Sequence, residues 1–142
     1  SARAAGVLSD LPVERLDALH SFGRQLGLAF QVVDDILDFT GSDQQLGKPA
    51  ASDLASGYLT APVLYALEER PSLARLIERE FSQEGDLDQA LALVRDSDAI
   101  PRSRALAEGF AREAYEAIEW LAPSDPRSAL RGLPEFVLSR LY

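Results

Sequence analysis

Three aspartates lie close together in an otherwise apolar stretch, FQVVDDILDFT, at residues 30–40. On a helix, Asp34 and Asp38 are four residues apart and Asp35 and Asp38 are three apart, so their carboxylates face one patch. Gln31 lies on the same face, three residues before Asp34. The other positions of this turn are apolar, and a helix that is apolar almost all round is usually buried. Because buried carboxylates must be paired or hold a metal ion, these acids are candidate metal ligands.

The surrounding sequence favours a metal ion over local ion pairs. No arginine occurs between Arg24 and Arg70, and Lys48 is the only lysine of the chain. Oxygen ligands select hard cations, and Mg²⁺ is usually held by one or two carboxylates together with water and phosphate. We therefore predict a Mg²⁺–diphosphate site at the three aspartates. A solvent-exposed acidic helix face is the alternative when the spacing is considered by itself.

The lone lysine lies where it could serve such a site. Lys48 follows Asp38 by ten residues and stands between Gly47 and Pro49. Its ammonium could return over the acidic patch and contact phosphate as a point charge; a surface lysine without a role is the alternative. Asp53, five residues further on, either holds Lys48 in place or caps a helix, and the cap is the simpler interpretation.

The elements that must position these residues are predicted to be helices. Apolar residues recur at three- and four-residue steps through most of the chain, and the alternation typical of strands is nearly absent. The spacing predicts one long helix over residues 13–39, including Phe30 on its apolar face, after Pro12 and before Gly41. Residues 41–56 are polar and contain glycine, which predicts a long loop of the kind that is often functional.

The rest of the chain is also predicted to be helical. Thr60 and Ser72 are expected to cap helices, Asp86 leads another, and the last helix is expected to break around Gly132 to Pro134. The resulting fold class is all-α, with one domain over residues 1–142 and about six helices. The expected helices after the first cover residues 60–70, 72–81, 86–100, 103–122 and 125–142.

Composition excludes several classes of function. The 142-residue chain has a formal charge of −9, which argues against a nucleic-acid partner. It has no cysteine, so it has neither disulfides nor thiolate metal ligands. No apolar run approaches the about 20 residues needed to cross a bilayer, and the sequence SARAAGVLSD is not a secretory signal. A cytoplasmic location is therefore the default expectation.

An ordered pattern extends from the aspartates into the following segment. GLAFQVVDDILDFTG and LGKPAASDLASGYLTAPVLYAL contain G-x-x-F-Q-x-x-D-D-x-x-D, then G-K with an aspartate five residues later, then G-x-x-T-x-P. This pattern resembles the second aspartate-rich region of all-trans polyprenyl diphosphate synthases. The closing FVLSRLY is similar to the tail of the long-chain, solanesyl-type members. The resemblance covers essentially the whole chain and implies the isoprenoid-synthase helical bundle as its fold.

The resemblance also implies an activity and its metal ligands. Family members ionise an allylic diphosphate with the help of Mg²⁺, and isopentenyl diphosphate attacks the carbocation, so the chain grows by one isoprene unit. Asp34 would be the direct Mg²⁺ ligand, and Asp35 and Asp38 would act through the metal or its waters. The implied partners are an allylic diphosphate and isopentenyl diphosphate, and the implied cofactor is Mg²⁺.

The same resemblance implies a substrate-binding set and an assembly. Phe30 and Gln31 would help to line the substrate site, and Lys48 would contact the allylic diphosphate. The assembly would be a homodimer, with a location in the cytoplasm or at the membrane surface through its apolar product.

The chain departs from the family pattern in several places. It has no first D-D-x-x-D motif, no Arg-Arg pair and no Lys-Thr, and Tyr58 stands where many members have lysine. We therefore expect the C-terminal half of such an enzyme, inactive or nearly so without the N-terminal half, which agrees with the absence of methionine. Apolar surface meant for that half should be exposed and favour association.

Two alternatives to the catalytic half remain. A non-catalytic helical subunit or interaction module of a heteromeric prenyl synthase would show the same departures from the pattern. A class I terpene cyclase also uses D-D-x-x-D, but the G-K-P and G-x-x-T-x-P elements weigh against it.

Overall fold

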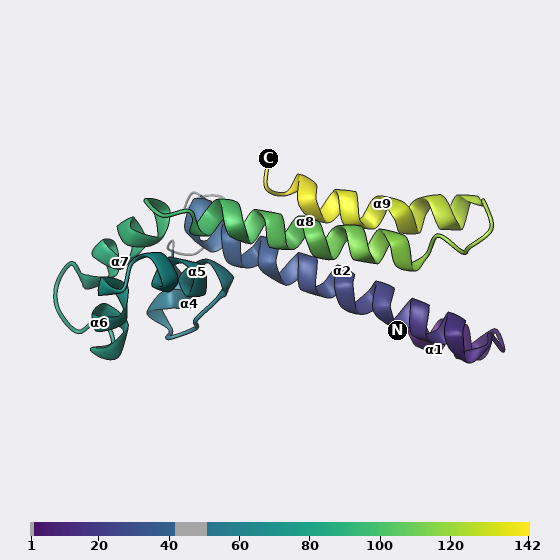
Figure 1. The fold of residues 1–142 in the computed structure, drawn as a ribbon, viewed down its shortest axis with the longest axis horizontal. Coiled ribbons are helices and arrows are strands. Elements are labelled where there is room, and N and C mark those ends of the chain that lie inside the picture. Colours follow the sequence, from purple (N-terminus) through teal and green to yellow (C-terminus); the bar gives the residue numbers. More distant parts are fainter. Residues whose placement is uncertain (1, 42–50) are drawn as a thin grey trace. The chain divides into compact units, whose positions relative to one another are not determined.

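The computed structural model describes residues 2–41 and 51–142, and within these ranges it contains helices and turns but no strand (Figure 1). The predicted all-α class is thus confirmed. The helices are α1 (Ala2–Leu8), α2 (Val13–Thr40), α4 (Ser52–Ala55), α5 (Ala61–Glu69), α6 (Ser72–Glu78), α7 (Asp86–Arg95), α8 (Ala99–Ala117) and α9 (Asp125–Ser139). None of these helices combines the length and the apolarity required to span a membrane.

Helix α2 agrees with its predicted bounds, whereas its surroundings differ in part. It starts directly after Pro12 and stops before Gly41. The segment predicted as a loop at 41–56 contains the short helix α4. At α6 the predicted cap is wrong, because Pro71 takes the N-cap position and Ser72 is already the first helical residue.

The structure also tests the predicted cap at Thr60 and the predicted helix break near Pro134. Thr60 does occupy the N-cap position of α5, but its side chain makes no capping hydrogen bond. The predicted break near Pro134 is wrong, because α9 continues through this residue. An internal proline removes one helical hydrogen bond. Pro134 and Val137 are both buried on the packed face of α9, and this burial holds the helix together across the missing bond.

By its internal contacts the chain divides into two compact units, and the first comprises Ser1–Val33 and Leu106–Tyr142. Its core joins α2 to α8 and α9, because each helix carries apolar side chains at three- to four-residue intervals. Arginines cover aromatic rings at its edge, with the Arg15 guanidinium 4.4 Å from the centre of the Trp120 ring. The buried core residues of this unit include Leu19, Phe22, Ala114 and Ile118.

The second unit comprises Asp34–Ala105, so the acidic end of α2 belongs to it together with α4 to α7. Fully burying an aliphatic or aromatic side chain contributes about 1.5–3 kcal/mol to stability. A continuous apolar cluster therefore fixes these short helices and the end of α2. Its buried members are Phe39, Ala51, Leu54, Val63, Ala66, Leu73, Leu76, Ala90, Val94 and Ala99.

Candidate functional site

The last two turns of α2 carry the three aspartates in the buried setting that the sequence predicts. Asp35 is 6% exposed and Asp38 only 1%, while Asp34 is partly exposed. Ile36 and Phe39, which separate them, are fully buried. A solvated acidic face is therefore wrong for Asp35 and Asp38, and Asp34 is the carboxylate with the greatest access to solvent.

The carboxylate of Asp38 connects α2 to the helix that follows. Its Oδ1 accepts a hydrogen bond from the Ser52 hydroxyl at 3.0 Å, and its Oδ2 accepts one from the Asp53 N–H at 3.1 Å. The Asp38 carbonyl accepts a third bond from the Ala51 N–H at 2.8 Å. The first N–H groups of a helix lack partners within the helix and need an outside acceptor. Asp38 thus does for α4 what an N-cap side chain usually does.

The actual N-cap residue of α4 is unsuited to that task. Ala51 occupies the position with φ 57° and has no polar side-chain atom. The interpretation of Asp53 as a cap is wrong, because this residue lies inside the first turn of α4. Lys48 lies outside the described residues, so its predicted phosphate contact and its pairing with Asp53 stay predictions.

Arg95 brings a cation to this end of α2 that the sequence pattern did not reveal. Its Nε donates a hydrogen bond to the Phe39 carbonyl at 2.9 Å, at the helix end where a positive charge is favourable. Because 56 residues separate Phe39 from Arg95 on α7, no local signal could have identified this contact.

The two residues expected to line the substrate site are both exposed on α2. Phe30 is 44% exposed, although the apolar periodicity placed it on the packed face. The guanidinium of Arg140, at the end of α9, lies 4.7 Å from the centre of the Phe30 ring, close enough for a cation–π interaction. Gln31 follows on the same exposed side. Sequence reasoning did not anticipate the contact of Phe30 with Arg140.

The chemistry of this donor set limits what it can hold. Within residues 2–41 and 51–142, no group of three or more His, Cys, Asp or Glu side chains is arranged to hold a metal ion. Mg²⁺ needs fewer protein ligands, because water and substrate phosphate complete its shell. The partly exposed Asp34, together with Asp35 and Asp38, is therefore compatible with a Mg²⁺ ion that an anionic substrate also binds. The same three residues fit a closed structural metal site less well.

Comparison with known sequences places this pattern among prenyl-transferring proteins. Residues 1–94, more than half of the chain, match the sequence profile of the family described as polyprenyl synthetase. The chain is 56% identical over 142 residues to a prenyl transferase of Synechocystis, covering 100% of this chain and 44% of that protein. It is 45% identical to the chloroplastic solanesyl diphosphate synthase 2 of Arabidopsis thaliana, covering 99% of this chain and 34% of the relative. The chain thus spans less than half the length of these relatives.

Solved structures show the same fold. The heptaprenyl diphosphate synthase of Staphylococcus aureus superposes with a TM-score of 0.89 at 30% identity, over 96% of this chain and 44% of that one. The polyprenyl synthase of Caulobacter crescentus, solved with calcium and isoprenyl diphosphate, gives 0.82 at 34% identity, over 96% of this chain and 43% of that one. The helical arrangement described above is therefore that of the polyprenyl synthases.

Proposed function

The chain belongs to the polyprenyl synthetase family, and from this premise we propose that it forms part of a prenyltransferase. The reaction is the elongation of an allylic diphosphate by isopentenyl diphosphate. The observation that carries the proposal is the acidic end of α2, where Asp35 and Asp38 are buried and Asp34 remains accessible. The names of the relatives, a prenyl transferase and a solanesyl diphosphate synthase, support the same reaction class.

The proposed metal ligands follow from accessibility. Asp34 binds Mg²⁺ directly in this proposal, while Asp35 and Asp38 act through the ion or its waters. Divalent-metal use is supported by the Caulobacter synthase, which was solved with calcium and isoprenyl diphosphate. When bound, Mg²⁺ would act as a Lewis acid that stabilises the charge of the departing diphosphate.

The other residues of the proposed site bind and orient the substrate. Lys48, which precedes Ala51 by three positions, supplies a charge to the allylic diphosphate. Phe30 and Gln31 offer an apolar ring and an amide on the exposed side of α2. The three hydrogen bonds that Ala51, Ser52 and Asp53 donate to Asp38 hold this segment, which follows Lys48 in the sequence, at the acidic end of the helix.

The proposal assigns only part of a catalytic site to this chain. The chain covers 44% of the Synechocystis relative, and it has neither a first acidic motif nor an Arg-Arg pair. Turnover in this proposal needs the remaining part of a synthase, within a homodimer. A cytoplasmic location is part of the same proposal, although the Arabidopsis relative is named as chloroplastic.

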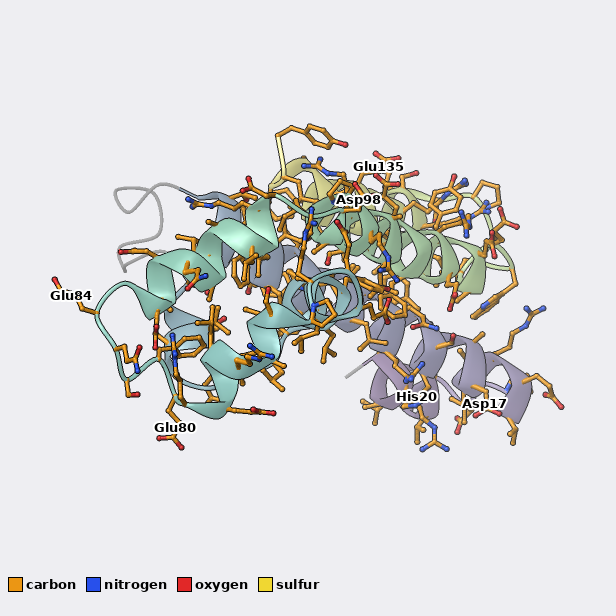
Figure 2. The ribbon with its side chains drawn as sticks, turned by 60° about the vertical axis from the view of Figure 1, so that its left-hand side comes forward. Asp17, His20, Glu80, Glu84, Asp98 and Glu135 are labelled. Carbon is orange, nitrogen blue, oxygen red and sulfur yellow. The ribbon has the colours of Figure 1, made fainter. Side chains whose placement is uncertain are left out.

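The test compares variants of the proposed ligands in a binding assay. Asp34→Ala and Lys48→Ala should each weaken Mg²⁺-dependent binding of geranylgeranyl diphosphate, measured by isothermal titration calorimetry. Asp17→Ala is the matched control, because Asp17 is an exposed acid in the first half of the same helix (Figure 2). Unchanged binding by both Asp34→Ala and Lys48→Ala would disprove the assignment of the site.

A second measurement tests whether the chain needs the remaining part of a synthase for turnover. The chain incubated with geranylgeranyl diphosphate, radiolabelled isopentenyl diphosphate and Mg²⁺ should give no prenyl product. Sustained turnover by this chain alone would show that the remaining part is not required. If the chain binds no allylic diphosphate, either alone or together with the remaining part of a synthase, this result would favour the non-catalytic subunit instead.

A further inference from the structure

A cavity of about 320 Å³ lies in the second unit, beside the ends of α4 and α6. This volume is near the lower limit of cavities that bind small molecules, which is about 300 Å³. None of the three aspartates of α2 belongs to its wall. The residues that line it are Leu54, Ala55, Ser56, Gly57, Leu59, Ile77, Glu80 and Phe81.

One side of this cavity is the C-terminal end of α4, which closes with a double hydrogen bond. The Gly57 N–H donates to the Leu54 carbonyl at 2.9 Å, and the Tyr58 N–H donates to the Asp53 carbonyl at 2.9 Å. This pair of bonds defines the Schellman motif, in which the residue after the C-cap has a left-handed backbone. Gly57 has φ 83°, and glycine accepts this conformation without steric cost.

The other side is the C-terminal end of α6, which closes in the same way with a different residue. The Glu80 N–H donates to the Ile77 carbonyl at 2.9 Å, and the Phe81 N–H donates to the Leu76 carbonyl at 3.1 Å. Here a glutamate takes the left-handed position with φ 53°, and Phe81 follows with φ 51°. Two consecutive non-glycine residues in this region store backbone strain, and such strain concentrates at functional positions.

The same chain thus uses glycine at one of these two equivalent positions and glutamate at the other. Strained non-glycine residues cluster at functional sites, so the Glu80 side chain is a candidate for a function. Among the lining residues that the structure describes, Glu80 alone has an ionisable side chain. The neighbouring Arg79 does not neutralise it, because Arg79 donates from Nε to the Asp86 carboxylate at 2.8 Å.

The electrostatic surroundings of the cavity favour a cation. The Glu80 carboxylate brings a full negative charge, and among the residues that the structure describes no lysine or arginine lines the wall. An anion such as a diphosphate is therefore disfavoured here.

We propose that this cavity binds a small molecule that carries a protonated amine on a short apolar body. The apolar part of the ligand lies among Leu54, Ile77 and Phe81, which form the apolar wall of the cavity. The ammonium lies at the carboxylate of Glu80, an exposed residue that lines the cavity. The proposal is independent of the prenyltransferase assignment, because it uses none of the residues of that site.

The test uses a charged probe and a neutral probe of nearly the same shape. The chain is titrated with 2-phenylethylammonium and with 2-phenylethanol, and amide shifts are followed by ¹H–¹⁵N NMR. The ammonium should shift the amides of Gly57, Leu59 and Glu80, and the alcohol should bind about fivefold more weakly, the size of one exposed charge interaction. Equal affinities for both probes, or shifts confined to other residues, would overturn the proposal.

Variants of the glutamate complete the test. Glu80→Gln should weaken binding of the ammonium about fivefold, whereas Glu84→Gln should leave it unchanged. Glu84 is the matched control, because it is an exposed acid on the same connection and does not line the cavity (Figure 2). Glu80→Gly should raise the melting temperature, since it relieves the left-handed strain, and should still weaken ammonium binding. Unchanged ammonium binding in either Glu80 variant would show that this carboxylate does not recognise the ligand.

Discussion

Asp34 and Asp38 belong to the same acidic motif on successive turns of α2, but their surroundings assign them different tasks. Asp34 is partly exposed, whereas Asp38 is buried and accepts hydrogen bonds from Ser52 and Asp53. A buried acceptor is costly to remove, because its donors, here on the partly buried Ser52 and Asp53, then lose their protein partner. Asp38 therefore contributes to stability in addition to its proposed role at the metal.

This difference predicts that the same substitution has different effects on stability at the two positions. Asp38→Ala should lower the free energy of unfolding by about 1–3 kcal/mol, because the Ser52 hydroxyl and the Asp53 N–H lose their acceptor. Asp34→Ala should change it by less than about 0.5 kcal/mol while it impairs diphosphate binding. Urea denaturation followed by circular dichroism measures both values. Equal stability losses in the two variants would contradict the distinction.

A second carboxylate makes stability depend on pH. Asp86 is 3% exposed, and the hydrogen bonds from Arg79 hold its pKa below the usual 3.8, against the opposing effect of burial. A carboxyl with a lowered folded-state pKa stabilises the fold above its unfolded-state pKa. This contribution disappears as the pH falls through the folded-state pKa.

Asp86→Asn should therefore be less stable than the unchanged chain at neutral pH, and the difference should shrink as the pH falls below about 4. Thermal unfolding at several pH values measures this trend. Asp88→Asn is the control, because Asp88 is an exposed acid in the same first turn of α7. A difference that stays constant down to about pH 2 would contradict the assigned pKa direction.

At the scale of secondary structure, α2 and the helices α5 to α9 could be predicted, whereas the short helices α1 and α4 could not. Helix α2 repeats its apolar positions over 28 residues, so the pattern alone identified it. Helix α4 has four residues and too few positions to show a period. Its first turn depends on the Asp38 carboxylate. Because residues 42–50 separate Asp38 from α4 in the sequence, no local pattern of residues predicts this contact. Helix α9 shows the reverse case, because burial overrides the break that Pro134 predicts.

The end of α4 gives a prediction about backbone conformation. Gly57→Ala should lower the free energy of unfolding by about 1 kcal/mol, because φ 83° is unfavourable for a residue with a Cβ. No atom lies within 4 Å of the position this Cβ would take, so the loss is conformational. Gly109→Ala in α8 is equally free of contacts and should raise stability by about 0.5–1 kcal/mol. Chemical denaturation compares the two, and a stabilising Gly57→Ala would exclude the left-handed backbone.

At the scale of the whole chain, charge and surface determine what can approach the site. The formal charge is −9 and the chain has a single lysine, so a diphosphate approaches an already negative protein. The acidic motif, its burial and its family could all be predicted from one sequence, because they depend on residues within a few turns of each other. The contacts of Phe39 with Arg95 and of Phe30 with Arg140 could not, since distant segments supply the partners.

This charge balance predicts a strict metal requirement. Geranylgeranyl diphosphate should bind only when Mg²⁺ is present, and chelation with EDTA should abolish the binding, because a chain with a formal charge of −9 repels the phosphates unless a metal ion lies between them. Geranylgeraniol, which lacks phosphates, should bind equally with and without the metal. Calorimetric titrations of both ligands check this, and diphosphate binding that survives EDTA would show that protein cations suffice.

The hydrogen bond from the Asp53 N–H to the Asp38 carboxylate also makes a single amide a reporter of the acidic site. An amide exchanges its hydrogen with solvent only when its hydrogen bond opens. A ligand that draws the Asp38 carboxylate toward itself releases the Asp53 amide, and a ligand that binds through Asp34 alone leaves it protected. The exchange rate of this amide, compared with and without Mg²⁺ and diphosphate, should therefore distinguish the two modes of ligation without any substitution in the chain.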